Sequence, residues 1–187
     1  MIKLNLGCWT RNFGPDWKHI DGGNYPHLDS HDIVNIPYED NSVDLIYASH
    51  VFEYFDREEG AKVLDKWFLK LKPGGILRIA VPDFEAMVKL YISGEYPLNK
   101  FLGPIFGKMS MDEQTIYHKT TYDFNSLSDM ILKAGFSSVK TYNWKNTEHA
   151  QFDDHSKAYV PHDPEAIKTG NFTEKHTLIS LNLETTK

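Results

Sequence analysis

The stretch LNLGCW (residues 4–9) stands almost at the start of the chain. Apolar residues alternate with a polar one up to Gly7, which is the pattern of a short β-strand. A glycine directly after a strand allows another group to approach the backbone closely, because no Cβ stands in the way. Trp9 follows two positions later, so the loop after this strand contains one very small and one very large side chain.

Further short apolar runs follow along the chain, separated by polar turns and by stretches with helical spacing. The expected strands are residues 2–6, 18–20, 32–34, 43–48, 76–81, 139–142 and 178–183. The expected helices are residues 58–72, 83–92 and 125–134. Strands that alternate with helices indicate an α/β domain with a mainly parallel sheet covered on both faces.

The composition is that of an ordinary globular protein. Of the 187 residues, 41% are hydrophobic and 25% are charged, and this length suggests one domain. The net charge of −6 argues against a nucleic-acid partner, which favours a basic face. One cysteine excludes an internal disulfide and fits a reducing compartment. No run reaches the roughly 20 apolar residues of a membrane span, and the first residues do not form a signal peptide, so a cytoplasmic location is expected.

Two long segments interrupt the alternation of strands and helices. Residues 95–122 are rich in Gly, Pro, Met and aromatic residues, whereas residues 143–176 contain few apolar ones. Loops of this length within a compact domain are uncommon and often functional. We therefore expect both segments to contribute to a ligand site, the alternative being a surface excursion. Four aromatic side chains of the first segment are suited to stacking on a ligand: Tyr96, Phe101, Phe106 and Tyr117.

Several polar residues fall just past the expected strand ends. Ligands of open α/β sheets bind beyond the carboxyl ends of the strands. Asp21 is placed to accept hydrogen bonds from both hydroxyls of a ribose, and Asp32, with Ile33, to contact an adenine. Either carboxylate can instead bind backbone amides of its own turn. Ser49 and His50 follow the next strand, where one of them is expected to touch the ligand.

The loop between Gly7 and Asp21 argues against one class of nucleotide. Its thirteen residues (8–20) include Gly14-Pro15 and the strand at 18–20, so a full helix hardly fits. A pyrophosphate is normally bound at a helix N-terminus, so NAD is not expected. An adenosine cofactor without phosphate, such as S-adenosylmethionine, escapes this objection.

An ordered set of segments resembles the class I S-adenosylmethionine-dependent methyltransferases. The set is LNLGC (4–8), HID (19–21), DIVNIPYEDNSVDLIYASHVFEYF (32–55) and LKPGGILRIAVPD (71–83), with weaker similarity over 117–136 and 179–185. The most similar group is the small type 11-like one, often linked to methylation of sugars or cell-surface glycans. The resemblance implies a three-layer Rossmann-like fold with a seven-stranded, mostly parallel sheet, helices on both faces and a shortened first helix.

The same resemblance implies one methyltransferase domain over residues 1–187, with acceptor-loop insertions at about 95–122 and 143–176. It also implies S-adenosylmethionine as the cofactor. The implied cofactor-binding residues are Leu6, Gly7, Cys8, Trp9, Asp21, Asp32, Ile33, Ser49 and His50.

Two positions depart from the family pattern. Trp9 stands where the family commonly has a second glycine, and Tyr54 where it often has a histidine after the glutamate. An extended backbone at residue 9 tolerates the indole, which then lies either over the cofactor or in the core. Glu53 either orients the site or is a solvated carboxylate at a helix start.

The acceptor determines what else the site needs. Transfer from a sulfonium relies on positioning and desolvation, but a sugar hydroxyl also needs a base or a metal. His118 is the expected base and Asp83 its helper or substitute, the alternatives being a surface histidine and a helix cap. No metal site is expected, because the histidines do not fall at the spacing that metal ligands have on one helix.

The reaction expected from these residues is O-methylation of a carbohydrate hydroxyl. The alternatives are methylation of a small metabolite such as a quinone or phenol, and a catalytically silent S-adenosylmethionine-binding protein. The expected partner is a small-molecule or glycan acceptor, without nucleic acid or a membrane span. The expected assembly is a monomer or homodimer.

Overall fold

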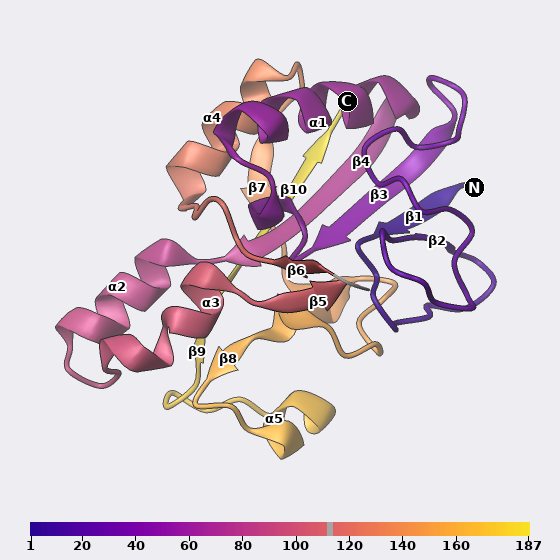
Figure 1. Cartoon of the computed structure of the whole chain (residues 1–187). Helices are drawn as coiled ribbons and strands as arrows, with labels where there is room; N and C mark the ends of the chain where they lie inside the picture. The colour runs from indigo at the N-terminus through magenta and orange to yellow at the C-terminus, as the bar shows by residue number, and fades with distance from the viewer. Residues whose placement is uncertain (112–113) are drawn as a thin grey trace.

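The computed structural model describes residues 1–111 and 114–187. Its main sheet contains β1 (Lys3–Leu6), β2 (Lys18–Ile20), β3 (Val43–Ser49), β4 (Leu71–Pro82), β7 (Val139–Thr141) and β10 (Ser180–Thr186). The strand order is β2-β1-β3-β4-β10-β7 (Figure 1). The first four strands in this order run parallel, and β10 is antiparallel to both of its neighbours. The carboxyl ends of β1, β2, β3 and β4 therefore lie along one edge of the sheet.

One face of the sheet is covered by α1 (Arg57–Lys70) and α4 (Phe124–Lys133) (Figure 1). The Asp56 side chain accepts hydrogen bonds from the backbone amides of Glu58 and Glu59, so α1 begins with a capping box. Val63, Leu64 and Trp67 of α1 are buried in the largest apolar cluster of the protein. Leu64 and Trp67, three residues apart, belong to the apolar spacing that predicted this helix.

The other face of β3 packs against irregular chain. Phe13 and Trp17, from the loop between β1 and β2, form a second apolar cluster with Leu45 and Tyr47 of β3, and Phe152 packs against it. Residues 7–17, all of which are described, contain no helix, so even the shortened first helix expected there is not formed. The aromatic side chains of this loop cover the sheet in place of a helix.

The expected sheet of seven strands is wrong, because residues 32–34 form no strand. The Asp32 carboxylate accepts hydrogen bonds from the backbone amides of Val34 and Asn35. These bonds bend the chain into a turn and use donors that a strand would give to its neighbour. The other six expected strands are formed, with ends shifted by a few residues.

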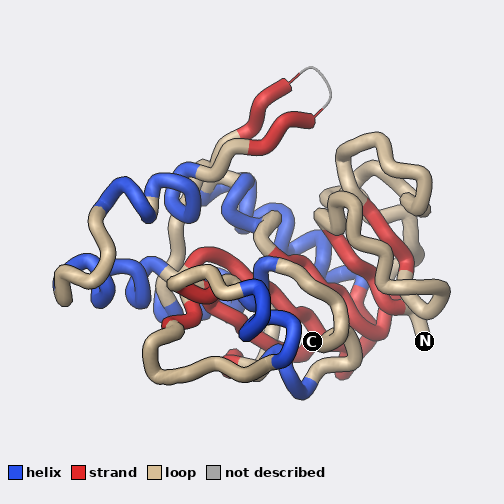
Figure 2. The backbone as a smooth tube through the Cα atoms, turned by 90° about the horizontal axis from the view of Figure 1, so that it is seen from below, coloured by secondary structure: helices blue, strands red, loops and turns tan. Residues whose placement is uncertain are grey.

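The two long segments carry short elements of their own. After α2 (Phe84–Ile92), the first contains η2 (Leu98–Lys100), α3 (Leu102–Phe106), β5 (Met109–Met111) and β6 (Gln114–Ile116). The second contains η3 (Trp144–Asn146), η4 (His155–Lys157), β8 (Tyr159–Val160) and α5 (Pro164–Thr169), and β8 pairs with β9 (Thr177–Leu178). Figure 2 shows the described parts of β5 and β6 projecting from the body of the protein. Residues 112–113 of the expected acceptor segment lie outside the described residues.

In the part of the chain that the structure describes, no helix combines the length and the apolarity that crossing a membrane requires.

Candidate cofactor and acceptor site

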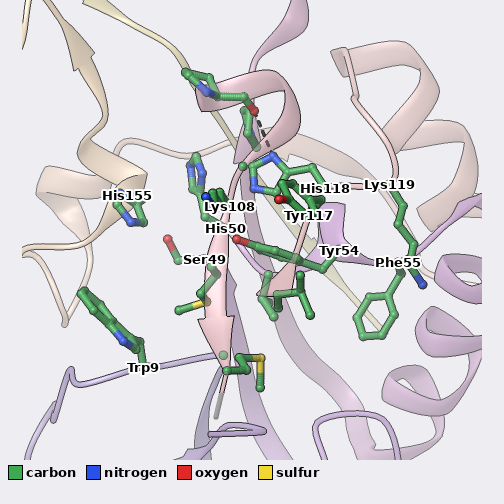
Figure 3. A pocket seen from close by; sticks show the side chains of 18 of the residues that line it. Trp9, Ser49, His50, Tyr54, Phe55, Lys108, Tyr117, His118, Lys119 and His155 are labelled. Carbon is green, nitrogen blue, oxygen red and sulfur yellow. Dashed lines mark hydrogen bonds between the residues drawn. The ribbon is translucent and has the colours of Figure 1, made fainter. Parts of the chain in front are cut away.

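A cavity of about 890 Å³ opens at the sheet edge where the parallel strands end. Residues that follow β1, β2 and β3 line one part of it: Gly7, Trp9, Asp21, Ser49, His50 and Val51. Side chains of the 95–122 segment and of the 143–176 segment line the other part (Figure 3). The cavity thus joins the strand ends, where a nucleotide is expected, to both segments expected to meet an acceptor.

Gly7 is required at its position for two independent reasons. Its φ is +65°, a left-handed conformation that favours glycine. A Cβ added to Gly7 would also lie 2.5 Å from the Cβ of Val51, which is far inside van der Waals contact. The short helix η1 (Phe52–Tyr54) begins directly after Val51, so Gly7 lets two cavity-lining segments approach each other.

Asp21 is buried, and it organises the loop after β1. Its two carboxylate oxygens accept hydrogen bonds from the backbone amides of Trp9, at 2.7 Å, and Gly23, at 2.8 Å. Each oxygen of a carboxylate has a second lone pair, so these bonds leave acceptor capacity on a side chain that lines the cavity. Asp21 therefore has the amide contacts of a turn carboxylate and remains available to a ribose.

Trp9 differs from the expectation of an extended backbone or a core aromatic. Its φ is +51°, and its side chain is 41% exposed and lines the cavity. A left-handed conformation is unfavourable for a bulky residue, and the Asp21 carboxylate that binds its amide helps to hold it. The Arg11 guanidinium lies 5.4 Å from the centre of the indole ring, so a cation and an aromatic face meet at the cavity wall.

The cavity accepts an adenosine cofactor without phosphate better than a dinucleotide. The loop of residues 7–17 presents no helix N-terminus to a pyrophosphate. Ile33 supplies an apolar wall, and the buried Ser49 hydroxyl has no hydrogen-bond partner among the described residues. The residues present thus fit S-adenosylmethionine.

Three of the expected cofactor residues do not line the cavity. Leu6 is buried in the core of the sheet. Cys8 is also buried, and burial raises the pKa of its thiol to about 12, so it is a small core residue and no nucleophile. The Asp32 side chain bonds to its own turn and to the Asn35 amide, and its neighbour Ile33 is the one that reaches the cavity.

Only one of the four aromatic residues expected to stack on a ligand lines the cavity, namely Tyr117. Phe101 is buried in a third apolar cluster with Met87 and Leu90 of α2, and Tyr96 packs against this cluster. The Phe106 side chain is 55% exposed and lies outside the cavity lining. The path of the 95–122 segment therefore takes these rings to different places, which a count of aromatic residues does not reveal.

His118 is brought to the cavity by the segment that follows β6. Its backbone amide donates to the carbonyl oxygen of Phe106, and its Nδ1 lies 3.0 Å from the carbonyl oxygen of Pro104 (Figure 3). Its ring meets the Tyr54 ring edge to face, with 4.7 Å between the ring centres. Burial lowers the pKa of the imidazole, so His118 is neutral near pH 7 and able to accept a proton.

Asp83 has the capping role. Its side chain accepts a hydrogen bond from the backbone amide of Ala86 at the start of α2. The side chain does not line the cavity, whereas the preceding Pro82 does. Burial raises the pKa of the Asp83 carboxyl, but its place outside the cavity lining removes it from direct contact with an acceptor.

The sequence leaves the role of Glu53 open, and His155 is not among the predicted site residues. Glu53 lies in η1 and is completely buried, with its Oε1 3.4 Å from His50 Nδ1 and 3.7 Å from His118 Nε2. His155, from η4, lines the cavity, and its ring centre is 5.3 Å from that of His50. A glutamate at a helix start is ordinarily solvated, so only the fold reveals the burial of Glu53.

Comparisons with known proteins agree with this fold. Residues 17–79 match the family model Methyltransf_11, described as a methyltransferase domain. A demethylmenaquinone methyltransferase of Staphylococcus haemolyticus is 31% identical over 135 residues, covering 66% of this chain and 52% of the relative. The chain therefore spans about half the length of the curated relatives it matches.

Solved structures share the architecture over the whole chain. An S-adenosylmethionine-dependent methyltransferase from Archaeoglobus fulgidus aligns with a TM-score of 0.56 at 15% identity, covering 100% of this chain and 86% of the other. The 1,6-didemethyltoxoflavin N1-methyltransferase of Burkholderia thailandensis, solved with S-adenosylhomocysteine, aligns with a TM-score of 0.55 at 13% identity, covering 100% and 70%. Residues 17–79 thus match a methyltransferase family model, and the whole chain shares the class I, Rossmann-like fold of solved S-adenosylmethionine-dependent methyltransferases.

Proposed function

We propose that the protein transfers a methyl group from S-adenosylmethionine to a small aromatic acceptor that carries a hydroxyl group, such as a quinol or phenol. The strongest support for this reaction is that one cavity is lined by both groups of residues. Gly7 and Asp21 line it from the strand ends, and Tyr117 and His118 line it from the acceptor side. One cavity of this kind brings a cofactor and an acceptor together.

The acceptor side favours an aromatic ring over a carbohydrate. Met109, Met111 and Ile116 give it an apolar surface, beside the polar side chains Lys108, Thr115, His118, Lys119 and His155. A sugar presents many hydroxyls that need hydrogen-bond partners, and burying them against apolar side chains is costly. The relatives named demethylmenaquinone methyltransferase support the same class, and so the carbohydrate acceptor that leads on sequence grounds becomes the weaker candidate.

Residues 1–187 form one methyltransferase domain in this proposal, and the 95–122 and 143–176 segments are its acceptor loops. When bound, the cofactor supplies an electrophilic methyl group on a positively charged sulfur. Asp21 and Arg11 orient it from the strand ends, and Tyr117 packs on the acceptor ring. His118 accepts the hydroxyl proton, which raises the electron density of the acceptor oxygen and ring.

The acceptor class is tested by measuring S-adenosylhomocysteine release with reduced quinones, simple phenols and free sugars as acceptors. Release is expected with quinols or phenols and not with sugars. Tyr117→Ala should lower turnover with the best acceptor, because this ring lines the cavity, and it should leave S-adenosylhomocysteine affinity within a few-fold. Phe106→Ala is the matched control, since that aromatic side chain lies outside the cavity lining. Release with sugars alone would overturn the proposed acceptor class.

A further inference from the structure

The Glu53 carboxylate is in an unusual environment behind the cavity wall. Its side chain is completely buried, it does not line the cavity, and neither oxygen has a hydrogen-bond partner among the described residues. Burying an ionised carboxylate without partners is strongly unfavourable. A residue of this kind therefore needs either a proton or a nearby cation.

The hydrogen bonds of His118 determine which of its nitrogens carries hydrogen. Nδ1 lies 3.0 Å from the carbonyl oxygen of Pro104, which can only accept. The neutral ring therefore has its hydrogen on Nδ1 and a lone pair on Nε2. Nε2 is the nitrogen that lies 3.7 Å from Glu53 Oε1.

His50 is fixed in the corresponding way by a chain of hydrogen bonds. The Asn182 amide nitrogen donates to the Ser156 carbonyl oxygen, so its Oδ1 is free to accept the Ser180 hydroxyl hydrogen at 3.0 Å. The Ser180 oxygen must then accept from His50 Nε2, at 2.9 Å. His50 Nδ1 is left with a lone pair, 3.4 Å from the same Oε1 of Glu53.

Two imidazole nitrogens that bear lone pairs thus lie 3.4 Å and 3.7 Å from one carboxylate oxygen. Three acceptors at this distance repel one another, and a single proton on the group removes the conflict. We propose that Glu53 and His118 act as one proton acceptor, with Glu53 as the positioning residue. At rest the pair holds one proton. When the pair has lost this proton, His118 Nε2 can accept the hydroxyl proton of the acceptor. The Glu53 carboxylate then stabilises the imidazolium that forms.

This proposal rests on the proposed methyl transfer, and its step balances. The acceptor O–H bond breaks, its electron pair stays on the acceptor, and an N–H bond forms at His118. The released proton later leaves through the cavity, which His118 lines. His50 does not take a proton from the acceptor in this scheme.

The charges around the pair agree with it. Burial raises the pKa of Glu53 to about 8 and lowers the pKa of both His50 and His118. The other titratable or charged groups facing the cluster are His155 and Arg11, which further lower the pKa of His50, and the tyrosines Tyr54 and Tyr122. A lone imidazole here would be a weak base, and the carboxylate makes the pair a stronger one.

The pH profile of turnover tests the pair. We expect wild-type turnover to rise with pH along a limb near pH 8. Glu53→Gln, which cannot ionise, should shift this limb by more than about one pH unit toward acid and lower the plateau roughly tenfold or more. Glu53→Asp retains a carboxylate and should keep the limb near its wild-type position. Glu58→Gln, at an exposed position, is the matched control. An unchanged limb in Glu53→Gln would contradict the proposal.

A second measurement needs no acceptor and therefore separates this proposal from the proposed function. Between about pH 4.5 and pH 8 the folded protein binds the Glu53 proton more tightly than the unfolded chain does, so the wild type loses stability as pH rises through this window. We therefore measure the urea midpoint of Glu53→Gln minus that of the wild type at each pH. This difference should increase from about pH 5 to about pH 8. If the difference in urea midpoint between Glu53→Gln and the wild type does not change with pH, the proposal of a shared proton is wrong. The proposal is also wrong if a chelator changes the wild-type stability profile and a divalent cation restores it.

Discussion

Replacing His118 by alanine should lower turnover by about 10²–10⁴, the usual contribution of a general base. The imidazole is the group of the acceptor side that both lines the cavity and presents a free lone pair. Affinity for S-adenosylhomocysteine should stay within a few-fold, because the strand-end residues that face the cofactor are unchanged. Steady-state kinetics with the best acceptor, combined with calorimetric titration of the cofactor product, separates the two effects.

His162→Ala is a suitable control for the loss of a histidine. His162 is exposed and lines a different cavity, formed by the 143–176 segment, so this variant should keep wild-type turnover. If His118→Ala retains both its rate and the pH limb near pH 8, then His118 takes no part in proton transfer.

Replacing Gly7 by alanine should destabilise the protein by about 2–5 kcal/mol. A left-handed residue with a Cβ costs roughly 1–2 kcal/mol, and forcing a methyl group into a packed position typically costs about 1–3 kcal/mol. Both costs apply here, because φ is +65° and the new Cβ would lie 2.5 Å from Val51. Urea unfolding measures the loss of stability. Cofactor affinity should also fall, because Gly7 and Val51 both line the cavity.

Gly94→Ala separates the two causes. Gly94 also has a positive φ, +78°, but a Cβ there would meet nothing within 4 Å. This variant should show the backbone cost alone, about 1–2 kcal/mol. Equal destabilisation of the two variants would mean that Val51 moves aside freely and that Gly7 is not a close-approach position.

The order and type of the main elements could be predicted because local signals agree with the tertiary structure. The apolar spacing that includes Leu64 and Trp67 matches the buried side of α1, which begins after the Asp56 cap and ends at Lys70, where β4 follows directly. Residues 32–34 show where such reasoning fails. Their apolar pair resembles a strand, but the Asp32 side chain takes the backbone amides, and a side-chain bond of this kind can outweigh a short apolar run.

The candidate site was predictable at the strand ends and not beyond them. Gly7 and Asp21 follow strands whose carboxyl ends must lie along one sheet edge, so topology alone places them together. Tyr117 and Phe106 are equal in sequence terms, and only the path of the 95–122 segment decides which one lines the cavity. The role of Glu53 depends on burial and on two histidine tautomers, which are set by partners far along the chain, Pro104 and Ser180.

The central claim is that the strand-end cavity binds S-adenosylmethionine through Asp21, and calorimetric titration tests it most directly. The wild type should bind S-adenosylhomocysteine and give no binding heat with NAD. A charge-assisted hydrogen bond contributes roughly 1.5–3 kcal/mol, so Asp21→Ala should weaken binding about tenfold or more. Asp16→Asn removes a charge from an exposed position of the same loop and should bind as the wild type does. Unchanged affinity in Asp21→Ala, or binding of NAD by the wild type, would contradict the account.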